Sequence, residues 1–244
     1  MTERSTRLRV TDVVKRFGGV TALAGVDLEL LDGEVLGLIG PNGSGKTTLV
    51  NCISGVLKVD GGEIVLEEEP ITGASRVKRA RRGIARTFQT PKLFGELTVW
   101  ENIAVGRGGL NRDRDDSVEQ RSEELIGRLG LADVNREVVS SLPYGIQRRV
   151  EVARALAGRP SILLLDEPAA GLNDSETAAL LGLLREVRRM LKCSILVIDH
   201  DMNLVLDVSD RVQVLDEGRV IFVGRPEDAF EQPHVVEAYL GVQD

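Results

Sequence analysis

A run of residues from Gly40 to Thr48 matches the pattern G-x-x-x-x-G-K-[ST] at every fixed position. The run consists of Gly40, Pro41, Asn42, Gly43, Ser44, Gly45, Lys46, Thr47 and Thr48. The apolar segment 35–39 before it predicts a buried strand, and segment 48–53 after it predicts a helix. A glycine-rich loop between a strand and a helix is the setting in which this pattern binds phosphate.

The residue types in this loop suit the phosphates of a nucleoside triphosphate. Glycines allow successive backbone N–H groups to surround a phosphate without Cβ clashes, and the following helix N-terminus adds partial positive charge. We expect the Lys46 ammonium to contact the outer phosphates and the Thr47 hydroxyl to bind Mg²⁺. A glycine-rich turn with an unrelated lysine is the competing interpretation, and the complete match in its proper context argues against it.

Two acidic residues, Asp166 and Glu167, follow a second apolar run, Ile162-Leu163-Leu164-Leu165. Such a short continuous run predicts a central parallel strand, with the carboxylates at its C-terminal end. Asp166 would bind the nucleotide-bound Mg²⁺ there, and Glu167 would orient and deprotonate an attacking water. A helix cap or a loop acid is the simpler alternative.

The elements that must position these residues predict an α/β fold. Alternating segments 8–14 and 26–30 indicate strands, and Asp32-Gly33 predicts a hairpin that joins the second strand to the P-loop strand. Segment 90–143 shows helical periods and little strand pattern, so we expect an inserted helical subdomain. Strand and helix alternate again afterwards, with a buried strand at 194–198 and a hairpin around 216–219.

A cluster of basic residues lies on a predicted helix between residues 75 and 82, namely Arg76, Lys78, Arg79, Arg81 and Arg82. A solvated helical face is the favoured interpretation. Contact with an acidic partner or with phospholipid headgroups is the alternative.

Composition excludes several other classes of protein. The net charge of −7 and the aromatic content of 3% argue against nucleic acid as a partner. No apolar stretch approaches the ~20 residues that span a bilayer, and the first residues lack the apolar core of a signal peptide. Cys52 and Cys193 lie far apart in apolar surroundings, which predicts buried free thiols in a reducing compartment. We therefore expect a cytoplasmic protein.

Five motifs in order resemble the nucleotide-binding subunit of an ABC transporter across essentially the whole chain. They are the P-loop, Gln89, Leu142-Pro143-Tyr144-Gly145-Ile146-Gln147-Arg148, Leu163–Glu167 and Asp199-His200-Asp201, preceded by Phe17-Gly18-Gly19. The resemblance implies a P-loop NTPase (RecA-like) core with an N-terminal antiparallel β subdomain, formed by 1–89 and 144–244. It also implies an inserted helical subdomain, 90–143, with the signature at its end, 142–148.

The resemblance assigns further roles in binding ATP and Mg²⁺. Phe17 would stack on adenine, although a lone phenylalanine is more often a core residue. Gln89 would sense the metal and the water and link them to the membrane partner, Glu167 would be the catalytic base, and His200 would contact the γ-phosphate. Tyr144 and Gly145 would belong to the signature loop, which opens a helix from Gln147 to Leu156 and closes over the ATP of a partner subunit.

Three positions depart from the usual family pattern. Pro143 occupies the usual serine position of the signature and has neither a hydroxyl nor an N–H to donate. Ile146 replaces the usual glutamine, and Asn173 stands where aspartate is usual. We infer that the site offered to the partner is the less active one.

Other segments resemble the branched-chain amino acid importer ATPases more closely. These are Ile84–Gln89, Leu93–Asn102, Glu167–Asn173 and Ala238-Tyr239-Leu240-Gly241. Such subunits act at the inner face of the cell membrane beside a second ATPase subunit, two membrane permease subunits and an extracytoplasmic substrate-binding protein. The segment 106–116 is short for this branch, and the ATPase sequence does not identify the transported substrate.

Several alternatives remain open at the level of sequence. An exporter or lipopolysaccharide-transport ATPase would carry nearly the same motifs, and the run Arg86-Thr87-Phe88-Gln89 favours import only modestly. A P-loop kinase or GTPase would need no signature helix, and the guanine-selecting N-K-x-D is absent from the chain. Soluble ABC ATPases of DNA repair or of ribosomes generally carry two cassettes or a long coiled-coil insertion, and this chain has neither.

Overall fold

The structure is a computed structural model that describes residues 4–107, 118–191, 193–199 and 202–240. The P-loop strand, β3, lies inside a six-stranded sheet with the order β10-β9-β3-β8-β7-β6. Strands β3, β7 and β8 are buried along their whole length, as their continuous apolar runs predict. Neighbouring strands run parallel except β9 and β10, which form the predicted hairpin. The strands are β3 (Val35–Ile39), β6 (Ile84–Arg86), β7 (Ile162–Asp166), β8 (Ser194–Ile198), β9 (Arg211–Asp216) and β10 (Arg219–Gly224).

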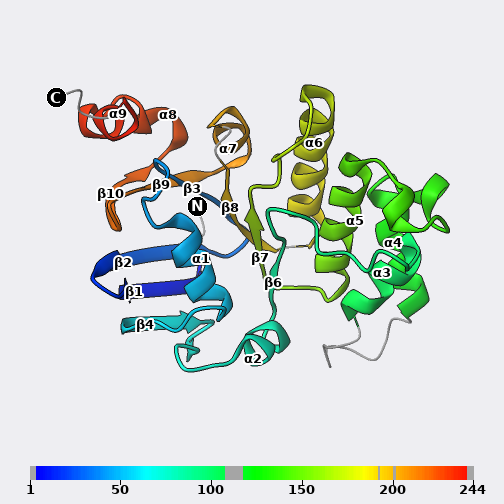
Figure 1. Ribbon diagram of the computed structural model, residues 1–244, viewed down its shortest axis with the longest axis horizontal. Helices are drawn as coiled ribbons and strands as arrows, with labels where there is room; N and C mark the ends of the chain where they lie inside the picture. Colours follow the sequence, from blue (N-terminus) through cyan, green and yellow to red (C-terminus); the bar gives the residue numbers. More distant parts are fainter. Residues whose placement is uncertain (1–3, 108–117, 192, 200–201, 241–244) are drawn as a thin grey trace.

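A second, four-stranded antiparallel sheet has the order β2-β1-β4-β5 and lies beside α1 in Figure 1. Its strands are β1 (Thr6–Phe17), β2 (Val20–Leu31), β4 (Gly61–Leu66) and β5 (Glu69–Pro70). The predicted hairpin at Asp32-Gly33 is wrong, because β2 pairs with β1 and β3 pairs with β8 and β9. The turn instead carries the chain from one sheet to the other, a role that the same turn residues can serve.

The helices surround the six-stranded sheet, and α3, α4 and α5 gather at the side away from the antiparallel sheet (Figure 1). Within the described ranges, no helix is long and apolar enough to cross a membrane. The helices are α1 (Lys46–Ser54), α2 (Arg76–Arg81), α3 (Val99–Arg107), α4 (Val118–Arg128), α5 (Tyr144–Ala157), α6 (Asp174–Leu191), α7 (Met202–Val208), α8 (Pro226–Ala229) and α9 (Pro233–Leu240), with short 3₁₀ helices η1 (Ala132–Val134) and η2 (Val139–Ser141).

Helix α1 is fixed between the two sheets by its apolar face. Leu49, Val50 and Ile53 of α1 are buried in one cluster with residues of both sheets, including Leu23 and Leu38. Each such side chain contributes roughly 1.5–3 kcal/mol relative to an exposed position. The loop that precedes α1 is therefore held at both ends by packed elements.

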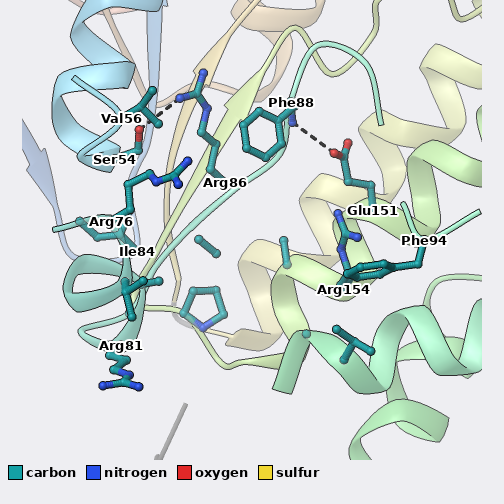
Figure 2. A pocket seen from close by; sticks show the side chains of 18 residues that line it. Ser54, Val56, Arg76, Arg81, Ile84, Arg86, Phe88, Phe94, Glu151 and Arg154 are labelled. Carbon is teal, nitrogen blue, oxygen red and sulfur yellow. Dashed lines mark hydrogen bonds between the residues drawn. The ribbon is translucent and has the colours of Figure 1, made fainter. Parts of the chain in front are cut away.

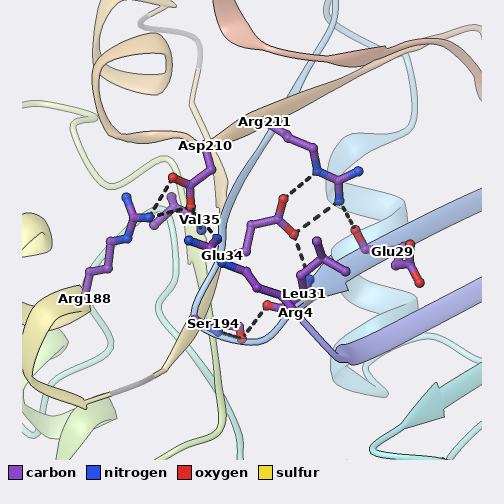
Figure 3. A network of polar contacts seen from close by, with 10 residues as sticks. Arg4, Glu29, Leu31, Glu34, Val35, Arg188, Ser194, Asp210 and Arg211 are labelled. Atoms are coloured by element: carbon purple, nitrogen blue, oxygen red, sulfur yellow. Dashed lines mark hydrogen bonds and ion pairs between the residues drawn. The ribbon is translucent and has the colours of Figure 1, made fainter. Parts of the chain in front are cut away.

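A buried carboxylate, that of Glu34, forms a second connection between the two sheets, in addition to the packing around α1. Glu34, which precedes β3, accepts bonds from Arg211 of β9 at 2.5 and 3.2 Å and from the backbone N–H of Leu31 at 2.7 Å (Figure 3). Arg211 also donates to the carbonyl oxygen of Glu29 in β2 at 2.9 Å. The carboxylate raises the pKa of Arg211, so the guanidinium stays charged. The ion pair itself joins the start of β3 to β9 within the six-stranded sheet, and its bonds to the backbone of Leu31 and Glu29 connect it to β2 of the antiparallel sheet.

Candidate nucleotide-binding site

Glycine is required at two positions of the loop between β3 and α1. Gly40 has φ 145°, and a Cβ there would overlap the carbonyl oxygen of Leu215. Gly45 has φ 106°, and a Cβ there would lie 2.6 Å from the carbonyl oxygen of Ala22. Both are conformations that residues with side chains rarely adopt. The glycines therefore permit the curved backbone that the sequence pattern predicts.

Lys46 begins α1 and turns its ammonium toward the loop. Its Nζ donates to the carbonyl oxygens of Gly40 and Pro41, each at 2.8 Å. Burial lowers the pKa of Lys46, while the nearby charge of Glu167 opposes that shift. Gly45 is the N-cap of α1, and no side chain of the described residues caps this helix. The N-terminal N–H groups and the ammonium together suit an anion.

The two acidic residues occupy different environments at the end of β7. Asp166 is 5% exposed and accepts a hydrogen bond from Arg86 at 2.6 Å. Glu167 has φ 47°, and its backbone N–H donates to the carbonyl oxygen of Ile198 at 2.7 Å. The Glu167 carboxylate accepts a bond from Nε2 of Gln89 at 2.7 Å. The structure therefore places Gln89 beside Glu167, and the expected roles of both residues stay predictions.

A cavity of about 180 Å³ brings the loop and one of the acids together. Its lining combines the loop and the start of α1 with Ala22 of β2 and with residues at the ends of β7 and β8. The lining residues are Ala22, Gly40, Asn42, Gly43, Gly45, Lys46, Thr47, Thr48, Glu167, Ile198 and Asp199. Asp199 is buried and accepts a bond from the backbone N–H of Ala169 at 2.9 Å, which fixes the turn after Glu167. A cation, a hydroxyl and a carboxylate thus face one space next to a helix N-terminus.

The donor set fits a magnesium ion that is shared with phosphates. Mg²⁺ prefers oxygen ligands and is commonly bound through one or two carboxylates and substrate phosphates. Of the three expected ligands, Thr47 lines the cavity, whereas Asp166 and Gln89 are absent from its described lining, so their role as ligands stays a prediction. Within the described part of the chain, no cluster of three or more His, Cys, Asp or Glu side chains could hold a metal without phosphate.

Phe17 ends β1 and is 47% exposed, so it is not a core residue. Its ring lies 5.4 Å from Nζ of Lys15, an exposed cation–π contact. Phe17 is absent from the described lining of the cavity, and its role toward adenine stays a prediction. His200 lies outside the described residues.

The signature region forms the first turn of α5. This helix begins at Tyr144, three residues earlier than the predicted start at Gln147, because Pro143 serves as its N-cap. The carbonyl oxygen of Pro143 accepts bonds from the backbone of Ile146 and Gln147, both at 3.0 Å. Proline fits this position, since a helix N-terminus needs no N–H from it.

Asn173 acts as a helix cap in the structure. Its Oδ1 accepts a bond from the backbone N–H of Glu176 at 3.0 Å, and Glu176 accepts one from the N–H of Asn173 at 3.0 Å. This reciprocal pair is a capping box at the start of α6. The Glu176 carboxylate also lies against Gly145, where a Cβ would overlap it. Glu176 therefore links the start of α6 to α5.

Arg148 belongs to the signature motif, but the motif gave no indication that this residue positions several site residues. Its buried guanidinium donates to the carbonyl oxygens of Gln89 at 2.6 Å and Glu167 at 3.1 Å, and to the Glu151 carboxylate at 2.9 Å. The Tyr144 hydroxyl donates to the same Gln89 carbonyl oxygen at 3.4 Å. This arginine was visible in the sequence, but nothing in its spacing indicated these partners.

A larger hollow of about 520 Å³ is lined in part by β6 (Figure 2). It is lined by α2, α3, α5 and the segment after β6, with exposed apolar residues Phe88, Phe94 and Val105. We call this hollow the groove. The guanidinium of Arg154 lies 5.7 Å from the Phe94 ring, and the Phe88 N–H donates to Glu151 at 3.3 Å.

Known proteins resemble this chain over nearly its full length. A family model described as ABC transporter matches residues 23–170. The high-affinity branched-chain amino acid transport ATP-binding protein LivG of Salmonella typhimurium is 42% identical, with 96% of this chain and 97% of LivG covered.

Solved structures show the same fold. The ADP conformation of an ATP-binding cassette of an ABC transporter superposes with a TM-score of 0.86 at 32% identity, covering 97% of this chain and 99% of that one. A dimeric post-hydrolysis cassette bound to ADP and Pi gives 0.79 at 26% identity, covering 90% and 98%. The predicted α/β fold with an antiparallel β sheet is confirmed, and the chain belongs to the ABC transporter family as an ATP-binding cassette.

Proposed function

We propose that this chain hydrolyses ATP to power an ABC importer of branched-chain amino acids or related small polar solutes. The full-length similarity to LivG is the observation that carries this proposal. The cavity lined by Lys46 and Glu167 supports the chemistry, because a cation that can bind phosphate and a carboxylate that can act as a base face the same space. The inner face of the cell membrane is the proposed place of action.

The P-loop residues would hold the triphosphate. Backbone N–H groups from Gly43 to Thr48 and the Lys46 ammonium would bind the phosphate oxygens, and Phe17 would stack on adenine. Thr47, Asp166 and Gln89 would hold Mg²⁺, which supplies charge neutralisation at the phosphates when bound. Most of the catalysis would then come from positioning and electrostatics.

Glu167 would act as the base in hydrolysis. The water oxygen bonds to the γ-phosphorus, the bond from that phosphorus to the bridging oxygen of ADP breaks, and Glu167 takes the water proton. The hydrogen bond that Gln89 Nε2 donates to Glu167, 2.7 Å long, would orient this carboxylate. His200 would contact the γ-phosphate.

Dimerisation would complete the site. Tyr144 and Gly145 at the start of α5 would face the ATP of a second ATPase subunit, as the dimeric relative motivates. The groove beside Gln89 would receive the membrane permease subunits, and an extracytoplasmic substrate-binding protein would take part indirectly. Pro143 donates no N–H, and Asn173 serves as a helix cap. We therefore propose that this chain pairs with a second, different ATPase subunit in an asymmetric dimer.

Two single substitutions separate binding from hydrolysis. We expect Lys46→Ala to remove both ATP binding and hydrolysis, and Glu167→Gln to retain binding while hydrolysis falls about 100-fold or more. Glu237→Gln, an exposed change on α9, serves as the control. Phosphate release and binding of a fluorescent ATP analogue measure the two properties. Hydrolysis by Glu167→Gln at the wild-type rate would contradict its role as the base.

The working assembly is tested by adding partners. ATPase activity and light scattering are measured for the chain alone and mixed with the second ATPase encoded beside it. Activity only in the mixture supports an asymmetric dimer, whereas an active ATP-dependent homodimer contradicts it. Co-purification with a permease pair and its substrate-binding protein supports import, and co-purification with an exporter membrane subunit contradicts import.

A further inference from the structure

Arg86 lies between the groove and the proposed magnesium site. It is the last residue of β6 and contributes to the lining of the groove, where Figure 2 shows its side chain directed toward Ser54. Its neighbour in the sheet is β7, which carries Asp166 at its end. The side chain thus reaches from the groove to the Asp166 carboxylate at the end of β7.

The Arg86 guanidinium is held by three acceptors. It donates to Asp166 Oδ2 at 2.6 Å, to Asn51 Oδ1 at 2.6 Å and to Ser54 Oγ at 3.1 Å. The ion pair is well buried, because the two side chains are 10% and 7% exposed. Asn51 and Ser54 belong to α1, so one cation connects the P-loop helix with the acidic strand.

The same side chain forms part of the groove wall. The Arg86 guanidinium carbon lies 5.1 Å from the centroid of the Phe88 ring, and Phe88 is 37% exposed in the groove. Arg86 Nε is buried and has no hydrogen-bond partner among the described residues. The guanidinium is therefore fixed at its far end by Asp166 and α1, and the Phe88 ring of the groove wall lies against it.

We propose that Arg86 is a positioning residue that links the groove to the Asp166 carboxylate, and this rests on the function proposed above. Its guanidinium acts as the counter-ion of Asp166 and gives way when the metal ion that accompanies the nucleotide binds. The shift of Arg86 then moves Phe88 at the groove wall. By reciprocity, contact of a partner with Phe88 changes the affinity of Asp166 for the metal.

Electrostatics give the direction of the effect on metal binding. Two cations that share one buried carboxylate repel each other, and the low dielectric of the interior strengthens that repulsion. Arg86 therefore opposes the metal while it shields the carboxylate in its absence. A residue that only stabilised the fold would not change metal affinity in this direction.

The first test measures Mn²⁺ binding by electron paramagnetic resonance, with Mn²⁺ as the probe for Mg²⁺ and the chain saturated with a non-hydrolysable ATP analogue. We expect Arg86→Met to tighten Mn²⁺ binding about tenfold and Arg86→Lys to stay within about twofold of the wild type. Arg188→Met is the matched control, because it removes another arginine paired with an aspartate at 2.6 Å. Unchanged or weaker Mn²⁺ binding by Arg86→Met would overturn the proposal.

The second test follows the groove directly. A fluorophore on Val56→Cys reports on the groove lining, and the native Cys52 and Cys193 are buried, so the label is selective. We expect the emission to change when metal joins the bound analogue in the wild-type background and to stay constant in the Arg86→Met background. Equal responses in both backgrounds, or none in the wild type, would refute the link to the groove.

Folding and function are kept apart in these tests. If Arg86→Met does not fold, as judged by circular dichroism, Arg86→Gln removes the charge and retains donors for Asn51 and Ser54. The Mn²⁺ measurement needs nucleotide binding but no hydrolysis. A wild type that binds metal and nucleotide without hydrolysing ATP would therefore contradict the proposed function and leave the role of Arg86 intact.

Discussion

Gly40 and Gly43 both have positive φ, but their surroundings differ. A Cβ at Gly40 would overlap the carbonyl oxygen of Leu215, whereas no described atom lies within 4 Å of a Cβ built at Gly43. We expect Gly40→Ala to lower the free energy of unfolding by about 3 kcal/mol and to abolish ATP binding. Gly43→Ala carries only the strain of φ 83°, about 1 kcal/mol. Urea unfolding and nucleotide titration compare the two, and equal losses would contradict this account.

Residue types in the sequence predicted the residues that line the cavity better than the arginines that hold those residues in position. The P-loop glycines, Lys46 and Glu167 were readable because phosphate chemistry restricts both residue type and spacing. Arg86 and Arg148 were not readable as positioning residues, since their partners come from segments far away in the sequence. A buried arginine can be recognised only once the strands that surround it are placed.

At the scale of elements, helices α1 and α2 are joined by a buried arginine. The solvated helical face expected for α2 is therefore incomplete, because Arg79 is 2% exposed. Its guanidinium donates to the carbonyl oxygens of Cys52 and Ile53 at 2.5 and 2.8 Å, at the C-terminus of α1. It also donates to the carbonyl oxygens of Thr72 and Ala74 at 2.8 and 3.0 Å. A cation there complements the helix dipole.

Removing this arginine should loosen the P-loop helix. We expect Arg79→Met to lower the free energy of unfolding by about 3 kcal/mol, because buried carbonyls lose their donors. Lys78→Met, an exposed change on the same helix, should cost under about 0.5 kcal/mol. Chemical unfolding followed by circular dichroism measures both. Arg79→Met with the stability of Lys78→Met would mean that water replaces the guanidinium.

Sequence patterns predicted the buried strands correctly, but they did not predict how the turn at Asp32-Gly33 connects the strands on either side of it. Strands β3, β7 and β8 followed from apolar runs, since each is covered on both faces. Asp32-Gly33 is compatible both with a hairpin and with a crossover, and only tertiary pairing distinguishes them. The start of α5 at Tyr144 does not follow from the sequence, because Pro143 at the N-cap has no side-chain acceptor and so gives no capping pattern.

At the scale of the whole molecule, the Glu34–Arg211 pair contributes to the contact between the two sheets through its bonds to the backbone of β2. We expect Glu34→Ala to lower the free energy of unfolding by about 2–3 kcal/mol, because it leaves a partly buried guanidinium without its carboxylate. The control is Arg225→Ala, whose side chain is 70% exposed, so its loss should leave the stability close to that of the wild type. Thermal unfolding compares the variants. A loss of stability in Glu34→Ala as small as that in the control would show that the contact between the sheets does not depend on this ion pair.

The open position of Gly43 has a consequence for the shelf life of the protein. Asn42 and Gly43 are both exposed, and with no side chain on Gly43 its backbone nitrogen can attack the Asn42 side-chain carbonyl. Ammonia leaves, and the cyclic imide hydrolyses to aspartate or isoaspartate. This ageing reaction would place a negative charge in a loop built for anions. We expect stored protein to gain isoaspartate at Asn42, measured by peptide mapping, and to lose ATP binding in proportion, with bound nucleotide slowing both.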